Sequence, residues 1–235
     1  MLHMRKYKVG VIRVLTTSDL NSMNYHGKLL EQYYPMFSVE SRCIPDQEEG
    51  IHDAVTLRKG APKVVELAKQ MWEDGFEAIV VSCAEDPGVE EARKLLPIPI
   101  IGAGESTAAL AVFFGNKPAA LGITAELPRV FERFFGDRLV DSTRGKGVTS
   151  TLDLATEAGY AATADAARRQ KEMGADVIAL SCTGMSTIGI APNLERDLGI
   201  PVLDPIMCAG LMTLFSLIRN DMIREDTQYA AETNS

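Results

Sequence analysis

One short segment occurs twice in the sequence, and this repeat constrains the fold more than any other feature. Residues 177–185 read VIALSCTGM, and residues 79–86 read IVVSCAED. Each copy is a run of apolar, mostly β-branched residues that ends in a Ser-Cys pair, which is typical of a buried parallel strand leading into a loop. Gly75 and Gly174 each precede the cysteine of their copy by eight residues. The chain is therefore predicted to be a duplicated unit.

The similarity between the two halves continues downstream of both cysteines. Residues 98–101 read IPII and residues 200–203 read IPVL, and each set enters another short apolar strand. Strands that alternate with helices in both halves predict an α/β fold with two pseudo-symmetric lobes, each a mainly parallel sheet flanked by helices. Ligands of such sheets bind beyond the C-terminal ends of the strands. Cys83 and Cys182 are therefore predicted to reach one active-site cleft between the lobes from opposite sides.

The repeat also divides the chain into domains. We assign residues 1–105 to an N-terminal α/β lobe and residues 106–205 to a C-terminal α/β lobe. A closing apolar helix at about 206–220 can pack back onto the first lobe, and residues 221–235 form a polar tail that is predicted to be frayed. Local patterns predict a polar loop at 45–60, a helix at 61–74 and a strand at 137–141.

Composition narrows the class of protein. The 235 residues carry a net charge of -8, whereas nucleic-acid binding depends on clustered Lys and Arg, so no nucleic-acid partner is expected. No apolar run reaches the roughly 18 residues that a membrane-spanning helix requires. The N-terminus lacks the apolar core of a signal peptide. We therefore expect a cytoplasmic protein with no membrane partner.

Metal binding is not expected either. The four cysteines, Cys43, Cys83, Cys182 and Cys208, show no C-x-x-C spacing, and the three histidines all lie in the first quarter of the chain. A zinc site needs a tighter grouping of such ligands. In a reducing cytoplasm the four cysteines are free thiols. Cys43 and Cys208 fit the ordinary role of a buried small hydrophobic residue.

Cys83 and Cys182 differ from the other two cysteines in their setting. Both lie beyond an apolar strand and ahead of a predicted helix start, which for Cys83 is marked by Asp86 as the N-cap and Pro87 as the first helical residue. Amide groups at a helix N-terminus lower the pKa of a thiol and can hold an anionic oxygen. We therefore expect the pKa of at least one of these two thiols to lie below that of a free cysteine.

The residues around both cysteines resemble those of the aspartate/glutamate racemase superfamily. CAEDPGVEEAR around Cys83 and SCTGMS around Cys182 are most similar to the hydantoin racemase branch, and the similarity extends to about Asn220. The resemblance implies a cofactor-independent racemase that moves a proton at a carbon next to a carbonyl, in a hydantoin or an amino acid. It makes Cys83 and Cys182 the acid/base pair, in which one thiolate removes the proton and the other thiol protonates the opposite face. It also implies a homo-oligomer.

Such a reaction needs hydrogen-bond donors for the carbonyl oxygen, because the charge of the carbanion spreads onto it. The candidate donors are backbone N–H groups that directly follow the two cysteines. They belong to Ala84 and Glu85 in the first lobe and to Thr183 and Gly184 in the second.

Three further residues are candidates for orienting the substrate. Thr16 and Thr124 follow the first strand of each lobe, and helix capping explains both equally well. Arg13 lies in an apolar strand near its exit, where it can pair with a substrate carboxylate or with a neighbouring acid. Hydantoin racemases usually carry an Asn-Pro-Asn-Thr-like segment after the first strand, whereas residues 12–17 of this chain read IRVLTT.

Two other functional classes are compatible with the sequence. The same scaffold can carry a maleate isomerase-like or an arylmalonate decarboxylase-like enzyme. The decarboxylases resemble one-cysteine versions of the site, whereas the isomerases keep both cysteines. A non-catalytic small-molecule binding protein can also keep the cleft without the chemistry.

Overall fold

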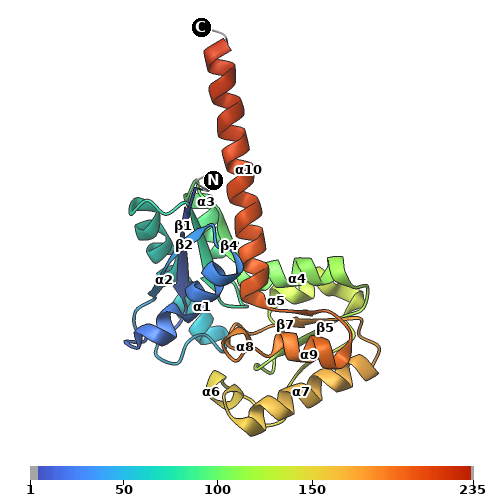
Figure 1. The fold of residues 1–235 in the computed structure, drawn as a ribbon. Helices are drawn as coiled ribbons and strands as arrows, with labels where there is room; N and C mark the ends of the chain where they lie inside the picture. Colours follow the sequence, from blue (N-terminus) through green and yellow to red (C-terminus); the bar gives the residue numbers. More distant parts are fainter. Residues whose placement is uncertain (1–4, 234–235) are drawn as a thin grey trace.

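The structure, a computed structural model, describes residues 5–233 of the chain, with side-chain environments described as far as Arg224. The described residues form two parallel sheets of four strands, and the order of the first, β2-β1-β3-β4, is repeated in the second, β6-β5-β7-β8 (Figure 1). The predicted pair of α/β lobes is thus confirmed. The strands are β1 (Tyr7–Arg13), β2 (Phe37–Cys43), β3 (Ala78–Ser82), β4 (Ile100–Gly102), β5 (Pro118–Gly122), β6 (Ser142–Arg144), β7 (Val177–Leu180) and β8 (Val202–Leu203).

Helices flank both sheets, and they separate the strands in sequence as right-handed crossover connections require. Figure 1 shows the shorter helices gathered around each sheet and α10 rising from the junction of the two lobes. The helices are α1 (Leu20–Tyr33), α2 (Ala54–Glu73), α3 (Val89–Leu95), α4 (Ala103–Phe114), α5 (Arg129–Phe135), the 3-10 turn η1 (Gly136–Arg138), α6 (Thr151–Leu154), α7 (Glu157–Glu172), α8 (Gly184–Thr187), α9 (Ala191–Leu198) and α10 (Pro205–Thr233).

The central strands β3 and β7 are buried on both faces, as their continuous apolar sequences predict. In β3, Ile79 packs with α2 and α3, while Val80 packs with α1 and α10. In β7, Ile178 packs with α7 and α9, while Val177 packs with α4 and α5. Burial of each such side chain contributes about 1.5–3 kcal/mol. The C-terminal ends of both strands are therefore rigidly held.

One helix begins earlier than the sequence pattern predicts. α2 starts at Ala54 rather than at residue 61, because Asp53 and Thr56 form a capping box. In this box the Asp53 carboxylate accepts a hydrogen bond from the Thr56 amide at 2.7 Å. The second half of the predicted polar loop at 45–60 is therefore helical.

One predicted strand is displaced along the chain. The strand expected at 137–141 lies at Ser142–Arg144 instead, as β6. Gly136, with φ of 49°, ends α5 and opens η1, which takes up Asp137 and Arg138. Hydrogen bonding to β5 begins at Val140, whose amide donates to the Pro118 carbonyl at 2.9 Å, and the paired register begins at Ser142, opposite Ala120.

α10 packs against the first lobe although it follows the second lobe in sequence. Its residues Ile206, Ala209 and Leu217 are buried in a core cluster shared with β1, β3 and α1. The helix then continues beyond residue 220 to Thr233, so the tail predicted to be frayed is helical as far as the structure describes it. Figure 1 shows this part of α10 extending beyond both lobes.

The first part of α10 is long and apolar. By length and composition alone, Pro205–Arg224 could cross a membrane, and 33% of its most apolar window is buried inside the protein. A mostly buried core helix of a soluble protein passes the same test. Here α10 contacts α4, α1 and β3, which accounts for its apolar inner face.

Candidate active site

Cys83 and Cys182 line the same cavity, which has a volume of about 760 Å³. Cys83 directly follows β3 and Cys182 follows β7 by two residues, so each thiol lies at the C-terminal end of a central strand. Both lobes contribute to the cavity wall. Arg13, His26 and the loop after β3 come from the first lobe, and Thr124, the start of α6 and the loop after β7 come from the second.

The loop that carries Cys83 is fixed by the helix after the next strand. The Asp86 carboxylate accepts hydrogen bonds from the amides of Gly104 at 2.8 Å and Glu105 at 2.6 Å, in the first turn of α4. A side chain at residue 104 would place its Cβ 2.1 Å from the carbonyl oxygen of Ala84, so this approach requires glycine. Asp86 therefore caps α4 and not α3, whose N-cap is Gly88, and this corrects the cap expected from the sequence.

The loop that carries Cys182 is held in a corresponding way. The hydroxyl of Ser186 in α8 donates to the Asp204 carboxylate at 2.9 Å. Asp204 also accepts from the amides of Ile206 at 2.9 Å and Met207 at 3.0 Å, in the first turn of α10. In both lobes, an aspartate thus joins the cysteine loop to the helix that follows the neighbouring strand.

The Cys83 thiol is buried and difficult to ionise. It is 6% exposed, and burial raises its pKa above that of a free cysteine. The amide of Glu85 donates to the sulfur and opposes this increase, but the negative charges of Glu85 and Asp86 add to it. Cys182 contributes to the increase as well, because a negative charge on it would disfavour a second one on Cys83. The acidifying effect of the Glu85 amide is outweighed by desolvation.

The Cys182 thiol is less protected. The residue is half-buried, and burial raises its pKa to about 11. Two amides, those of Gly184 and Met185, donate toward the sulfur and lower the pKa, although less than burial raises it. The prediction that at least one thiol has a lowered pKa is therefore wrong. Cys182 is the thiol that ionises more readily of the two.

The four predicted backbone donors lie beside the thiols. Ala84, Glu85, Thr183 and Gly184 all line the cavity. The amides of Glu85 and Gly184 point toward Cys83 and Cys182, respectively. In the part of the chain that the structure describes, the amides of Ala84 and Thr183 donate to no other backbone or side-chain oxygen, so both remain available to a ligand.

Arg13 ends β1 and contributes a buried cation to the cavity wall. It is 7% exposed, and its Nη1 donates to the carbonyl oxygens of Ser22 at 2.8 Å and Met23 at 3.4 Å. Burial lowers the pKa of Arg13 from its ordinary value. Among the described residues no Asp or Glu forms an ion pair with Arg13, so the neighbouring acid that the sequence left open is not found.

His26 is part of the cavity wall that the sequence analysis missed. It is 1% exposed, with Nδ1 2.6 Å from the Ser82 hydroxyl and Nε2 2.9 Å from the Thr187 hydroxyl. The imidazole therefore connects the residue before Cys83 with α8 of the other lobe. Burial, and secondarily the charge of Arg13, hold the pKa of His26 well below its ordinary value, so the ring is neutral.

Comparison with known proteins identifies the family of this two-lobed cysteine site. The sequence matches the Asp/Glu/hydantoin racemase family over residues 16–212, which is most of the chain. The chain belongs to this family. The resemblance seen in the residues around Cys83 and Cys182 is thus confirmed.

Individual members of the family and proteins of the same fold support this conclusion. A hydantoin racemase of Pseudomonas sp. (strain NS671) is 32% identical over 158 residues, which cover 62% of this chain and 60% of that protein. An allantoin racemase from Klebsiella pneumoniae superposes with a TM-score of 0.80 at 22% identity, covering 92% of this chain and 89% of that one. A double mutant of arylmalonate decarboxylase gives a TM-score of 0.68 at 18% identity, covering 90% and 93%. At these identities the two structures show a shared fold alone.

Within this racemase-family site the two candidate threonines have different roles. Thr124 lines the cavity, and its hydroxyl donates to the Glu126 carbonyl at 2.8 Å. Thr16 does not line it, because its hydroxyl donates to the Ile44 carbonyl at 2.7 Å and accepts from the Gln47 amide at 2.8 Å. Thr16 therefore fixes the loop after β2, which corrects the expectation that it orients a ligand.

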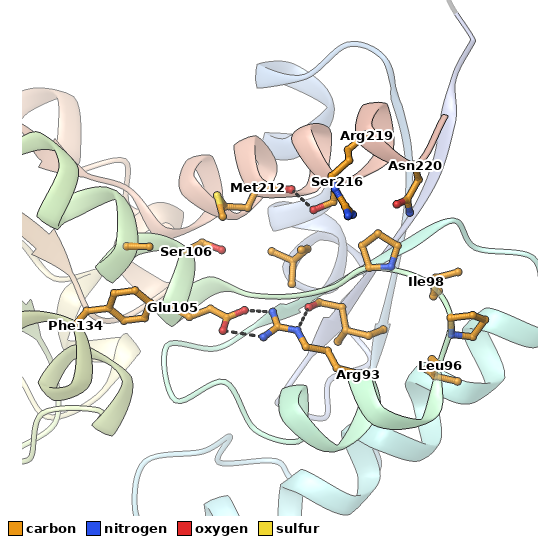
Figure 2. A pocket seen from close by; sticks show the side chains of 15 residues that line it. Arg93, Leu96, Ile98, Glu105, Ser106, Phe134, Met212, Ser216, Arg219 and Asn220 are labelled. Carbon is orange, nitrogen blue, oxygen red and sulfur yellow. Dashed lines mark hydrogen bonds and ion pairs between the residues drawn. The ribbon is translucent and has the colours of Figure 1, made fainter. Parts of the chain in front are cut away.

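A second cavity of about 560 Å³ lies away from the cysteines, between the loop before β4, α4 and α10. Figure 2 shows Arg93 at its edge, paired with Glu105 of α4 and donating from Nε to the Ile100 carbonyl at 2.8 Å. Met212 and Arg219 reach it from α10. Because it contains neither thiol, this cavity is not the candidate reaction site.

Proposed function

We propose that this family member is a cofactor-independent racemase that transfers a proton at a carbon next to a carbonyl, in a hydantoin or an amino acid. The observation that carries the proposal is that Cys83 and Cys182 come from different lobes and line one cavity. The similarity to a hydantoin racemase supports the same class of substrate.

In the proposed reaction the two thiols exchange roles with the substrate enantiomer. One cysteine, as thiolate, removes the α-proton from one face and becomes a thiol. The other, as thiol, gives its proton to the opposite face and becomes a thiolate. One C–H bond is broken and one is formed, so the product differs from the substrate only in configuration and no redox partner is required.

The intermediate is an enolate whose negative charge lies mainly on the carbonyl oxygen. The free amides of Ala84 and Thr183, one from each lobe, are suited to donate to that oxygen. Preorganised donors of this kind stabilise a developing charge more than water does, because they need no reorientation during the reaction.

The environment of the thiols has a consequence for the rate. Burial raises the pKa of both thiols, so few of them are ionised near neutral pH, but each thiolate that forms is a strong base. The ionised fraction rises about tenfold per pH unit below the pKa. The proposed racemase is therefore expected to work faster in alkaline than in neutral buffer.

A panel of enantiomers in deuterium oxide tests the function. Each enantiomer of several 5-substituted hydantoins, of aspartate and of glutamate is incubated with the protein without cofactor, and optical rotation and α-deuteration are followed. Deuterium exchange accompanied by inversion supports the proposal. If no compound exchanges while several raise the melting temperature, the protein is a binding protein and the proposal is wrong.

A second enzyme class is supported by the fold it shares with arylmalonate decarboxylase. A decarboxylase-like or maleate isomerase-like enzyme would use one cysteine to protonate the substrate or to add to it. Phenylmalonate and maleate therefore belong in the same panel. Turnover of either compound without racemisation of any other would favour this alternative.

A further inference from the structure

Arg13 is a buried cation whose charge the protein leaves uncompensated. It is 93% buried, since only 7% of it is exposed, and no carboxylate of the described residues forms an ion pair with it. Removing a charged side chain from water costs several kcal/mol unless an opposite charge or hydrogen bonds replace the water. Carbonyl oxygens of Ser22 and Met23 supply part of that replacement at Nη1.

The remaining donors of Arg13 have no partner in the described part of the protein. A guanidinium has five N–H groups, and Nη1 accounts for two of them through its two carbonyl partners. Nε and Nη2 have no hydrogen-bond partner among the described residues. In the described part of the chain, the side-chain atoms that are fully buried without a partner are Ser41 Oγ and Gln170 Oε1, so Nε and Nη2 of Arg13 keep some exposed surface. Because Arg13 lines the cavity of the two thiols, these nitrogens are open to its contents.

The other ionisable groups of the cavity do not neutralise this cation. Glu48, Glu49 and His52 line the cavity but are exposed. Glu85 is half-buried, and its charge interacts with Arg129 rather than with Arg13. His26, next to Arg13, is neutral. The inner wall is therefore positively charged while the acids lie toward solvent.

The second lobe has no counterpart of Arg13. Arg13 pairs with Ser82, the residue before Cys83, whereas Leu121 pairs with Leu180, which puts Gly122 beside Ser181. A Cβ at residue 122 would lie 2.5 Å from the Ser181 hydroxyl, so a side chain at this position would require that hydroxyl to move. The cationic group is thus present on one side of the cavity only.

We propose that Arg13 is the anion-binding residue of this cavity and that the substrate carries a carboxylate, which docks against Arg13 in the first lobe. The proposal rests on the proposed function and selects within it: an open-chain amino or carbamoyl acid is preferred over a neutral hydantoin ring. A planar guanidinium can bind a carboxylate through two parallel hydrogen bonds. With Arg13 on one side only, both enantiomers bind with the carboxylate toward the first lobe, and the α-carbon lies between the thiols.

Binding measurements on a protein without catalytic thiols test this inference independently of turnover. Calorimetry with the Cys83→Ser/Cys182→Ser protein near pH 7 compares ligands that share an uncharged side chain: phenylalanine, N-carbamoylphenylalanine and 5-benzylhydantoin, with the corresponding methyl and isobutyl series. At least one of the two carboxylates of a series is expected to bind about tenfold or more tightly than its neutral ring. If the hydantoin binds as tightly as both carboxylates in every series, the inference is wrong, whether or not the native protein racemises anything.

Substitution of Arg13 in the same background provides the second arm. Arg13→Met is expected to weaken carboxylate binding about tenfold or more and to leave hydantoin binding within about twofold. Arg13→Lys keeps the positive charge but not the two parallel N–H donors of the guanidinium, so it should weaken carboxylate binding less than Arg13→Met does. It replaces Arg13→Met if that variant does not fold. Arg144→Met is the matched control, because Arg144 ends β6 in the second sheet and does not line the cavity. Unchanged carboxylate affinity in both folded Arg13 variants would overturn the inference.

Discussion

The two lobes share a strand order and a strand–Ser–Cys segment, but they present different side chains to the cavity. The first lobe contributes the cation of Arg13 and the neutral ring of His26. The second contributes Thr124 and has Gly122 in the place of Arg13. The repeated features place two thiols at equivalent positions. The departures from the repeat make the two sides of the cavity chemically different.

The thiols themselves also differ between the lobes. Cys83 is buried, one amide donates to it, and the negative charges of Glu85 and Asp86 lie nearby. Cys182 is more open and receives two amides. A symmetric backbone therefore holds two thiols of unequal acidity, so Cys182 is expected to be the thiolate of the resting protein more often than Cys83.

Removal of either thiol is expected to have the largest effect, because it tests whether both lobes contribute a reactive thiol. Because each face of the α-carbon needs its own acid or base, Cys83→Ser and Cys182→Ser should each lower kcat/KM for racemisation by about 10²–10⁴-fold. Polarimetry with the best substrate of the panel measures this, and circular dichroism confirms that the variants fold. Racemisation at the parent rate in either variant contradicts the assignment of a two-thiol site.

Alkylation sharpens the difference between the two thiols. Iodoacetamide reacts with thiolates, so Cys182 should be modified at least about tenfold faster than Cys83, and its rate should rise with pH up to about 11, the pKa to which burial raises it. Peptide mass spectrometry after timed quenching gives both rates in one sample. Faster modification of Cys83 would reverse the proposed order of acidity.

Replacement of His26 tests the contact between the lobes. His26→Gln should destabilise the protein by about 1–3 kcal/mol, because hydrogen bonds to Ser82 and Thr187 are weakened in a buried setting. Denaturant unfolding at pH 7.5 measures the loss. His52→Gln is the control, since His52 is exposed, and it should change the stability little. A stability loss no larger in His26→Gln than in His52→Gln would contradict the bridging role.

The same histidine predicts how stability depends on pH. The pKa of His26 is lowered in the folded state, so its contribution to stability is present above the unfolded pKa of roughly 6.5 and is lost as the pH falls below it. Each pH unit below that value should cost about 1.4 kcal/mol until the folded group protonates. Melting curves of the parent and of His26→Gln between pH 7.5 and 5 measure this loss of stability. The parent should lose more stability than His26→Gln, by roughly the amount assigned to His26. An equal loss in both proteins would assign the acid sensitivity to other groups.

Substitution of the two cysteines outside the repeat should have the smallest effect on activity. Cys208 is buried on α10 and Cys43 ends β2, and neither lines the cavity of the thiols. Cys43→Ala and Cys208→Ala should therefore keep kcat/KM within about twofold of the parent, while Cys208→Ala lowers stability by about 1 kcal/mol through lost packing. A large loss of activity in either variant would show that the repeat is a poor guide to the site.

Much of the fold could be predicted from the sequence because its signals are local. Apolar β-branched runs gave β3 and β7, and their duplication gave the matching order of the two sheets. The start of α2 was missed because Asp53 and Thr56 look like loop residues until their capping box is seen. The strand β6 was misplaced because the conformation of Gly136 decides where pairing begins.

The candidate site was harder to predict where it depends on distant contacts. The sequence indicated both cysteines and their neighbouring amides. It did not indicate that Asp86 caps α4, because the sequence pattern pointed to the helix that directly follows Asp86. His26 contacts Thr187, 161 residues away. The sign of the thiol pKa changes was wrong because burial, set by the packing of both lobes, outweighs the nearby amides. The helical spacing of His26 and Leu30, both buried on α1, was a signal that could have revealed the histidine.

The most direct test of the two-thiol account is α-deuteration of separate enantiomers in deuterium oxide by the parent protein and the two single cysteine variants. The account predicts that the parent exchanges the α-proton of both enantiomers with inversion. It also predicts that Cys83→Ser and Cys182→Ser no longer invert, and that each exchanges only one enantiomer, opposite in the two variants. Inversion of either enantiomer at the parent rate by Cys83→Ser would contradict the account.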